Sequence, residues 1–310
     1  MKLFKKILVA GVAAAMTLSL GACGNKEDAE VVNVEMEEVS NGEDDVNAEK
    51  LTFGTNAEFP PFEYISSEGV IDNFDGIDMA IADTIATQCG YEAEINNMEF
   101  DSLLLALQNG QVDAVIAGMT ITDERKEAVD FSVPYYKATQ VMIAKDDSDI
   151  KSAADMKGKK IAVVLGYTGE ECVKKMGYEY EAFKKGSETI LELLNGKCDV
   201  VVIDSATAEK YIGDNEGLKI IEDPNAFVAE EYGIAVKKGN KELLDKINTA
   251  IQSMIDDGSI SEIAAEYLDE DSADDTEGAE AEGAEAGEVK MEEINEDENG
   301  EKPEVEGLDQ

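Results

Sequence analysis

The sequence predicts an α/β protein with mixed, mostly parallel sheets flanked by helices. Short apolar runs typical of buried strands alternate with amphipathic helical patterns, which is the order expected of α/β proteins. Several of the helical patterns end at a glycine, the residue that most often terminates a helix. These patterns fill residues 51–269, and 219 residues are enough for two modest lobes.

The first half of this region begins with a strand pattern at 51–55. Apolar residues at every fourth position then predict a helix over 77–89. Asp101 is placed to cap a second helix that runs to Gln108. The mostly apolar residues 112–117 predict a buried strand after it.

The second half repeats this order of strands and helices. Its expected elements are a strand at 161–165, a helix from about Glu170, a helix at 187–194, a strand at 199–203, a long helix at 241–257 and a short helix ending at Leu268.

The first 23 residues have the pattern of a secretion signal. Three lysines precede the apolar run 7–20, which is shorter than the about 20 residues needed to span a bilayer. Residues 20–23 (LGAC) resemble a bacterial lipobox, which implies a lipidated Cys23 that holds the mature chain at a membrane. The alternative is an ordinary cleavable signal with an accidental cysteine.

The formal net charge of −44 is unevenly distributed. Residues 24–50 hold 10 acids and 2 bases, and residues 270–310 hold 18 acids and 2 bases. Both flanks lack aromatic residues and are dense in acids, so we predict an acidic disordered tether at 24–49 and an acidic disordered tail at 270–310. Such a chain repels nucleic acid and anionic lipid, and neither is an expected partner.

The composition excludes several chemistries. The sequence has no histidine, which rules out histidine-dependent nucleophilic triads and histidine metal sites. Cys89, Cys172 and Cys198 lack the spacing of metal ligands or redox pairs, and we expect three free or buried thiols. No metal, cofactor or catalytic residue is predicted.

Residues 117–125 (AGMTITDER) offer the groups that bind an anion. They leave the carboxyl end of a buried strand, where open α/β sheets bind their ligands. Gly118 permits close approach of the backbone, Thr120 offers a hydroxyl and an N–H group, and Arg125 offers a bidentate cation. The alternative is that Arg125 is a solvated surface residue on a polar helix at 123–127.

Several separated motifs resemble those of the family 3 extracellular solute-binding proteins, which serve amino-acid ABC importers. The resemblance extends over about 51–268 and rests on five segments: 54–63 (GTNAEFPPFE), 74–80 (FDGIDMA), 117–125, 130–136 (DFSVPYY) and 232–235 (YGIA). It implies a two-lobed periplasmic-binding-protein-like fold of type II. The first lobe would comprise residues 50–138 with 232–269, and the second lobe residues 139–231.

The resemblance also assigns roles to individual residues. Thr120, Arg125 and Thr168 would hold the carboxylate of an amino acid, and the Gly118 carbonyl and Asp204 would hold its ammonium. Asp204 has a second interpretation, as the N-cap of a helix. The residues expected to line the side-chain pocket are Asn56, Phe59 and Phe100, of which the two phenylalanines are also open to an interpretation as ordinary core aromatics.

Three departures from the family pattern bear on the ligand. Asn56 stands where relatives that prefer basic amino acids carry an acid, and Val164 stands where glutamine-binding relatives carry a lysine. Tyr167 replaces a small hydroxyl residue and is expected to crowd the pocket. We therefore expect a small, uncharged amino acid.

The expected function is capture of that amino acid by hinge closure and its delivery to the permease of an ABC importer. The protein would be a monomer, held by its lipid at the extracytoplasmic face of the bacterial membrane. One alternative is a dehydratase acting on a cyclic amino or keto acid, with Glu170 or Glu171 as general acid. The other is a sensor that reports the ligand to a signalling partner.

Overall fold

The computed structural model describes residues 49–269, and these residues form two five-stranded sheets. The predicted signal, tether and acidic tail lie outside the described residues. We call the part built on the first sheet lobe 1. Its sheet contains, in spatial order, β5 (Glu92–Asn97), β1 (Lys50–Thr55), β6 (Ala114–Val115), β15 (Ala235–Lys237) and β7 (Val129–Phe131).

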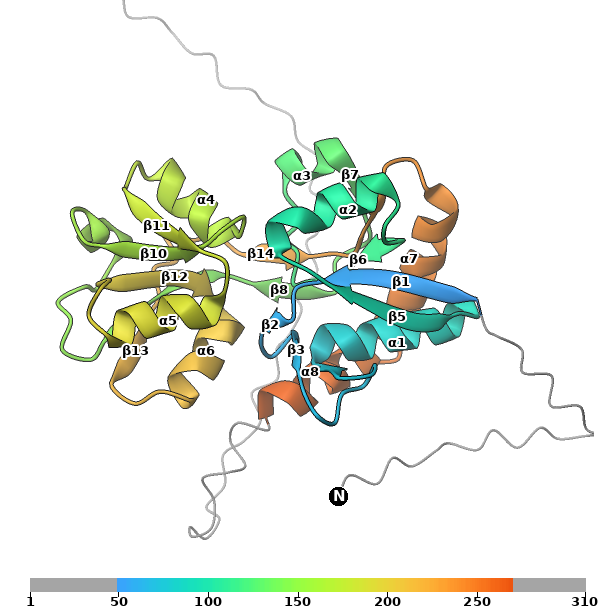
Figure 1. Cartoon of the computed structure of the whole chain (residues 1–310), viewed down its shortest axis with the longest axis horizontal. Helices are drawn as coiled ribbons and strands as arrows, with labels where there is room; N and C mark the ends of the chain where they lie inside the picture. The colour runs from blue at the N-terminus through green and yellow to red at the C-terminus, as the bar shows by residue number, and fades with distance from the viewer. Residues whose placement is uncertain (1–48, 270–310) are drawn as a thin grey trace, which may run out of the picture. The chain divides into compact units, whose positions relative to one another are not determined.

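Lobe 1 mixes parallel and antiparallel pairs. β1 pairs in parallel with β5 and β6, whereas β15 runs antiparallel to β6 and β7. Helices cover both faces of the sheet (Figure 1). They are α1 (Ile77–Cys89), η1 (Phe100–Ser102), α2 (Leu103–Asn109), α3 (Asp123–Ala128), α7 (Lys241–Asp256) and α8 (Ser259–Asp269). A small sheet beside them contains β2 (Glu58–Phe59), β3 (Glu63–Ile65) and β4 (Phe74–Asp75).

The second sheet defines lobe 2. Its strands, in spatial order, are β11 (Tyr180–Phe183), β10 (Ile161–Val164), β12 (Val200–Asp204), β9 (Gln140–Lys145) and β13 (Leu218–Ile221). The helices of this lobe are η2 (Ala153–Met156), α4 (Thr168–Lys175), α5 (Gly186–Leu194) and α6 (Ser205–Gly213). All residues of β10 and β12 are buried, as their continuous apolar sequences require.

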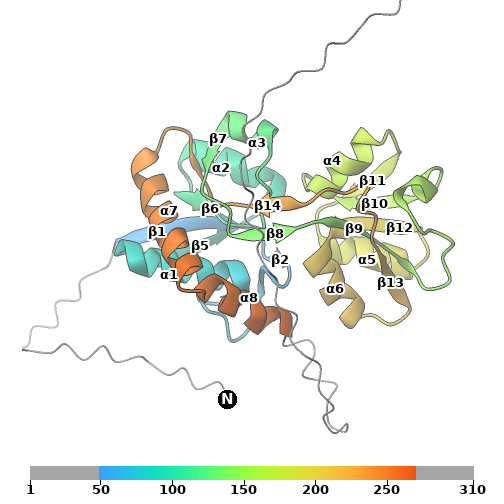
Figure 2. The same cartoon turned by 180° about the vertical axis from the view of Figure 1, so that it is seen from behind.

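Two short strands connect the lobes. β8 (Tyr136–Ala138) and β14 (Glu230–Tyr232) pair antiparallel and lie side by side in both views (Figures 1 and 2). The chain passes through β8 from lobe 1 into lobe 2 and returns through β14. This double crossing connects the lobes by two adjacent strands, which we call the hinge strands.

Some local expectations were wrong. The side chain of Asp101 makes no capping bond, because Phe100–Ser102 form a turn of 3₁₀-helix that feeds directly into α2. The helix expected from Glu170 begins two residues earlier, at Thr168. The strand expected over 112–117 pairs only at Ala114 and Val115.

The three cysteines in the described part of the chain are free thiols. No helix within residues 49–269 combines the length and the apolar character needed to cross a membrane.

Candidate functional site

Arg125 is a buried side chain on a polar helix. Only 8% of the residue is exposed, although its neighbours on α3 are charged, so the surface interpretation was wrong. The Thr122 hydroxyl caps the helix by accepting from the Arg125 main-chain N–H at 3.2 Å. The guanidinium donates to the Thr120 carbonyl at 2.8 Å. It also donates to the carbonyl of Gly166, which belongs to lobe 2, at 2.9 Å.

The Arg125 guanidinium is a buried cation without an ion-pair partner among the described residues. Burial lowers the pKa of Arg125, while the negative charges of Glu171 and Glu230 oppose that shift. The Arg125 guanidinium lies over the ring of Phe100, with its central carbon 5.3 Å from the ring centroid. A buried cation with only carbonyl partners is suited to receive an anion.

Asp204 supplies a buried carboxylate from lobe 2. It ends β12, is 3% exposed, and accepts a hydrogen bond at Oδ1 from the Tyr232 hydroxyl. Asp204 occupies the N-cap position of α6, but its side chain makes no capping bond. Burial and the nearby charge of Glu230 raise its pKa to about 7.

A small enclosed cavity of about 10 Å³, room for about one water molecule, lies between these two charged groups. Both lobes contribute to its lining, which consists of Phe59, Phe100, Ala117, Gly118, Thr120, Arg125, Tyr167, Thr168 and Asp204. Seven of the eight residues expected at the site therefore line one cavity. The eighth, Asn56, is buried behind the lining and donates to the Met98 carbonyl at 2.9 Å.

Gly118 is a position that only glycine can occupy. Its φ of +50° is unfavourable for other residues, and a Cβ atom would lie 2.4 Å from a ring carbon of Phe59. Asp78 holds the Gly118 peptide in place, since its Oδ2 accepts from the Gly118 N–H at 2.7 Å. Because position 118 has no side chain, the Gly118 backbone itself forms part of the cavity wall.

Glu230 is a functional candidate that the sequence pattern did not reveal. Its Oε2 accepts from the Thr120 hydroxyl at 3.0 Å and from the Thr168 hydroxyl at 2.7 Å, so one oxygen connects the two lobes through β14. Each hydroxyl has a single proton, which is used in these contacts. The two threonines therefore have their main-chain N–H groups left to offer to an anion.

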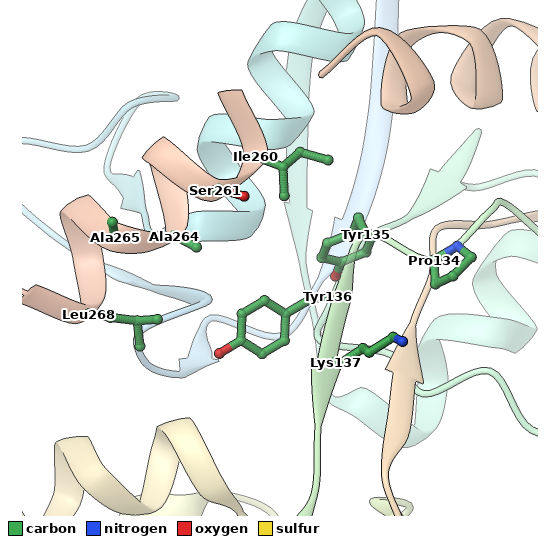
Figure 3. Close-up of a pocket in the computed structure, with 9 residues that line it drawn as sticks. All are labelled: Pro134, Tyr135, Tyr136, Lys137, Ile260, Ser261, Ala264, Ala265 and Leu268. Carbon is green, nitrogen blue, oxygen red and sulfur yellow. The ribbon is translucent and has the colours of Figure 1, made fainter. Parts of the chain in front are cut away.

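A second cavity lies on the hinge side of lobe 1, between β8 and α8. Figure 3 shows Tyr136 directed toward the face of α8 that carries Ala264 and Leu268. Among the described residues that line it, Lys137 alone is charged. Without a carboxylate, this cavity cannot pair both ends of a zwitterion.

Comparison with known proteins defines the class of this chain. Residues 51–270 match the family described as bacterial extracellular solute-binding proteins, family 3. The arginine-binding extracellular protein ArtP of Bacillus subtilis (strain 168) is 38% identical over 269 residues, which cover 85% of this chain and 98% of ArtP. The chain therefore belongs to family 3 of the bacterial extracellular solute-binding proteins.

Solved structures agree with this assignment. An ancestral arginine-binding protein bound to glutamine matches with a TM-score of 0.66 and 45% identity, covering 70% of this chain and 97% of that one. The arginine-, lysine-, histidine-binding protein ArtJ of Geobacillus stearothermophilus matches with a TM-score of 0.67 and 38% identity, covering 72% and 100%. The expected binding-protein fold and the expectation of a solute-binding protein instead of an enzyme are both confirmed by these relatives.

Proposed function

We propose that this protein is the substrate-binding subunit of an ABC importer and captures a small, uncharged amino acid by closure of its two lobes. One observation carries the proposal: buried Arg125 from lobe 1 and buried Asp204 from lobe 2 line the same enclosed cavity. An amino acid has one anionic and one cationic end, and each is costly to bury without a partner. Closure supplies both partners at once.

The carboxylate of the ligand would be bound by the Arg125 guanidinium and by the main-chain N–H groups of Thr120 and Thr168. Thr168 is the first residue of α4, where N–H groups have no partner within the helix and the helix dipole favours an anion. The ammonium would be bound by Asp204 and by the Gly118 carbonyl. Phe59 and Phe100 would contact the side chain.

The proposal of an uncharged side chain rests on the charges around the cavity. Among the described residues that line the cavity, Asp204 is the only acid, and it would pair with the ligand's ammonium. Asn56 stands behind the wall with its amide already bonded to Met98. A cationic side chain would thus lack a carboxylate. The named ligands of the relatives include both arginine and glutamine, so the family alone does not fix the choice.

The proposed setting is the extracytoplasmic face of the membrane. The relatives are named as extracellular or ABC transporter binding proteins, which supports a permease as partner. The lipobox-like residues 20–23 support a lipid anchor at Cys23. We propose that the protein acts there as a monomer.

The dehydratase alternative finds no support in the positions of the two candidate acids. Both oxygens of Glu170 are engaged, one by the Gly166 N–H at 2.6 Å and the other by the Tyr180 hydroxyl at 3.0 Å. Glu171 pairs with Lys175 at 3.3 Å. Neither residue lines the enclosed cavity.

A thermal-unfolding screen of the purified chain against the twenty common amino acids tests the proposal. A ligand at about 100 times its dissociation constant stabilises the protein by roughly 2.7 kcal/mol, which raises the midpoint by several degrees. We expect one or a few uncharged amino acids to do so, and Arg125→Ala or Asp204→Ala to abolish the shift. Lys126→Ala, which removes an exposed cation from the same helix as Arg125, is the matched control. If no amino acid raises the midpoint, the proposed function is wrong.

A further inference from the structure

Asp78 is a buried carboxylate beside the proposed ammonium site. It is the second residue of α1, and its side chain is fully buried. Its main-chain N–H donates to the Phe62 carbonyl at 2.9 Å, which ties the start of α1 to the loop between β2 and β3. A buried carboxylate is costly unless donors satisfy it, so the groups that donate to Asp78 show what it holds in place.

Two donors converge on one oxygen of Asp78. Oδ2 accepts from the Gly118 N–H at 2.7 Å and from the Tyr135 hydroxyl at 2.9 Å. The other oxygen, Oδ1, has no donor among the described residues. Tyr135 is itself fixed, because its main-chain N–H donates to the carbonyl of Tyr232 on β14 at 3.0 Å. Asp78 therefore links the loop that contains Gly118 to the residue that precedes the hinge strand β8.

Gly118 needs such an external restraint. It has no side chain, and glycine adopts many backbone conformations at little cost. After Gly118 the chain is fixed at Met119, whose carbonyl accepts from the Gly233 N–H at 3.0 Å. Before it, the bond to Asp78 fixes the peptide that joins Gly118 to Ala117. The direction of the Gly118 carbonyl, which lies between these two fixed points, depends on both bonds.

The Asp78 carboxylate is largely ionised at neutral pH. Burial raises its pKa to about 6, and the bonds from Gly118 and Tyr135 oppose that rise. A hydrogen bond to an ionised acceptor is roughly twice as strong as one between neutral groups. The Gly118 peptide is therefore held by a strong bond that lies outside the cavity.

We infer that Asp78 is a positioning residue for the ligand's ammonium, because its bond to the Gly118 N–H keeps the Gly118 carbonyl directed at that group. The inference rests on the proposed function, in which the Gly118 carbonyl and Asp204 bind the ammonium. Asp78 does not line the cavity and would not touch the ligand. Its loss should weaken the part of the affinity that comes from the ammonium and spare the part that comes from the carboxylate.

The test compares the best-binding amino acid of the screen with its des-amino acid, the carboxylic acid that has hydrogen in place of the amino group. The des-amino acid keeps the carboxylate and the side chain and lacks only the ammonium. Calorimetry measures the dissociation constant of the amino acid directly and that of the weaker des-amino acid by displacement. Circular dichroism checks the folding of each variant.

Two variants of Asp78 separate the hydrogen bond from the space that the side chain fills. Asp78→Ala removes the acceptor, whereas the side-chain oxygen of Asp78→Asn can still accept from Gly118 and Tyr135. Asp83→Ala is the matched control, because it removes an exposed acid from the same helix. If Asp78→Ala does not fold, Asp78→Ser takes its place, since its polar hydroxyl is too short to reach the Gly118 N–H.

In Asp78→Ala we expect the amino acid to lose about tenfold or more in affinity and the des-amino acid to lose less than about threefold. Asp78→Asn and Asp83→Ala should stay within about threefold of the wild type for both ligands. The inference is overturned if Asp78→Ala weakens both ligands equally or weakens neither, or if Asp78→Asn loses as much affinity as Asp78→Ala.

The proposed function and the inference fail in different ways. If the amino acid binds, Arg125→Ala abolishes its binding and Asp78→Ala leaves the ratio of the two affinities unchanged, the proposed function stands while the inference fails. If no amino acid binds the wild type, both fail.

Discussion

At the scale of single residues, the two charged groups of the cavity differ in how firmly they hold their charge. Arg125 remains a cation at any ordinary pH even though burial lowers its pKa. Asp204 has a pKa raised to about 7 by burial and by the neighbouring charge of Glu230. The Asp204 carboxyl is thus partly protonated near neutral pH in the ligand-free protein.

Ligand affinity should therefore depend on pH through Asp204. A bound ammonium favours the ionised carboxylate, so below about pH 7 the protein must release a proton in order to bind. We expect the dissociation constant to rise below pH 7, by up to about tenfold for each pH unit, and to level off above pH 8. Calorimetry between pH 5.5 and 8.5 in buffers of different ionisation enthalpy measures both the affinity and the proton release.

Asp204→Asn separates the titration of Asp204 from a general loss of ligand binding at low pH. The asparagine cannot titrate, so its weaker binding should be independent of pH over the same range. A wild-type affinity that is constant from pH 5.5 to 8.5 would contradict the role given to Asp204.

At the scale of elements, a buried acid pair joins β3 to α1 under the site. Glu63 and Asp78 are both fully buried, and burial together with the neighbouring charge of Asp78 raises the pKa of Glu63. Asp78 Oδ2 accepts from the Gly118 N–H and from the Tyr135 hydroxyl, whereas Asp78 Oδ1 and both Glu63 oxygens have no hydrogen-bond donor among the described residues. Two facing carboxyls can bond only when one carries a proton, and burial raises the pKa of Glu63 well above its ordinary value.

The pair predicts that stability falls as pH rises. Both acids have folded-state pKa values above those of the unfolded chain, with Asp78 at about 6, so the stabilisation is complete at low pH and is lost as pH rises through the folded-state values. Glu63→Gln keeps a donor toward Asp78 at every pH. We expect it to unfold at about the same temperature as the wild type at pH 5 and roughly 4–8 °C higher at pH 8, or about 2 kcal/mol.

The control for this prediction is Glu92→Gln, which changes an exposed carboxylate on β5. It should follow the wild-type dependence of the unfolding midpoint on pH. If Glu63→Gln destabilises the protein equally at pH 5 and pH 8, Glu63 and Asp78 do not share a proton.

The hinge strand β14 yields a separate prediction through Glu230. The bonds from Thr120 and Thr168 to one Glu230 oxygen join lobe 1 to lobe 2. They exist only while the lobes are together, so Glu230→Ala should speed ligand dissociation by about 5- to 20-fold and alter association little. Surface plasmon resonance or stopped-flow mixing measures both rates.

Glu231→Ala is the matched control for Glu230→Ala. Glu231 is on the same strand, but its half-exposed side chain only approaches Lys137, at 3.9 Å, and should be nearly neutral. An unchanged dissociation rate in Glu230→Ala would show that the bonds do not hold the lobes together.

Elements with strong local signals were predictable from the sequence. The four-residue spacing of isoleucines gave α1 at Ile77–Cys89, and Gly90 ends it in the left-handed conformation. The hinge strands were not predictable, because β8 and β14 are three residues long and pair across more than ninety positions of sequence. The burial of Arg125 depends in the same way on Gly166 of the other lobe, which no local pattern on α3 reveals.

At the scale of the whole molecule, lobe contacts and ligand contacts use the same residues. Arg125 bonds to Gly166, Tyr167 bonds to Asn56, and Tyr232 bonds to Asp204 across or beside the hinge. The ion pair between Lys185 and Glu58 adds a peripheral contact between the lobes, but both side chains are partly exposed and contribute little. The proposed closure would therefore be coupled to the groups that bind the ligand's two charged ends.

Removing one charge of the ligand at a time tests whether Arg125 and Asp204 bind its two ends together. For the best-binding amino acid found in the screen, calorimetry compares the free amino acid with its methyl ester, which lacks the carboxylate, and with its N-acetyl derivative, which lacks the ammonium. We predict that only the free amino acid binds tightly and that each derivative loses at least about a hundredfold, because a buried charge on one lobe is left unpaired. If either derivative binds as tightly as the free amino acid, Arg125 and Asp204 do not jointly hold the ligand.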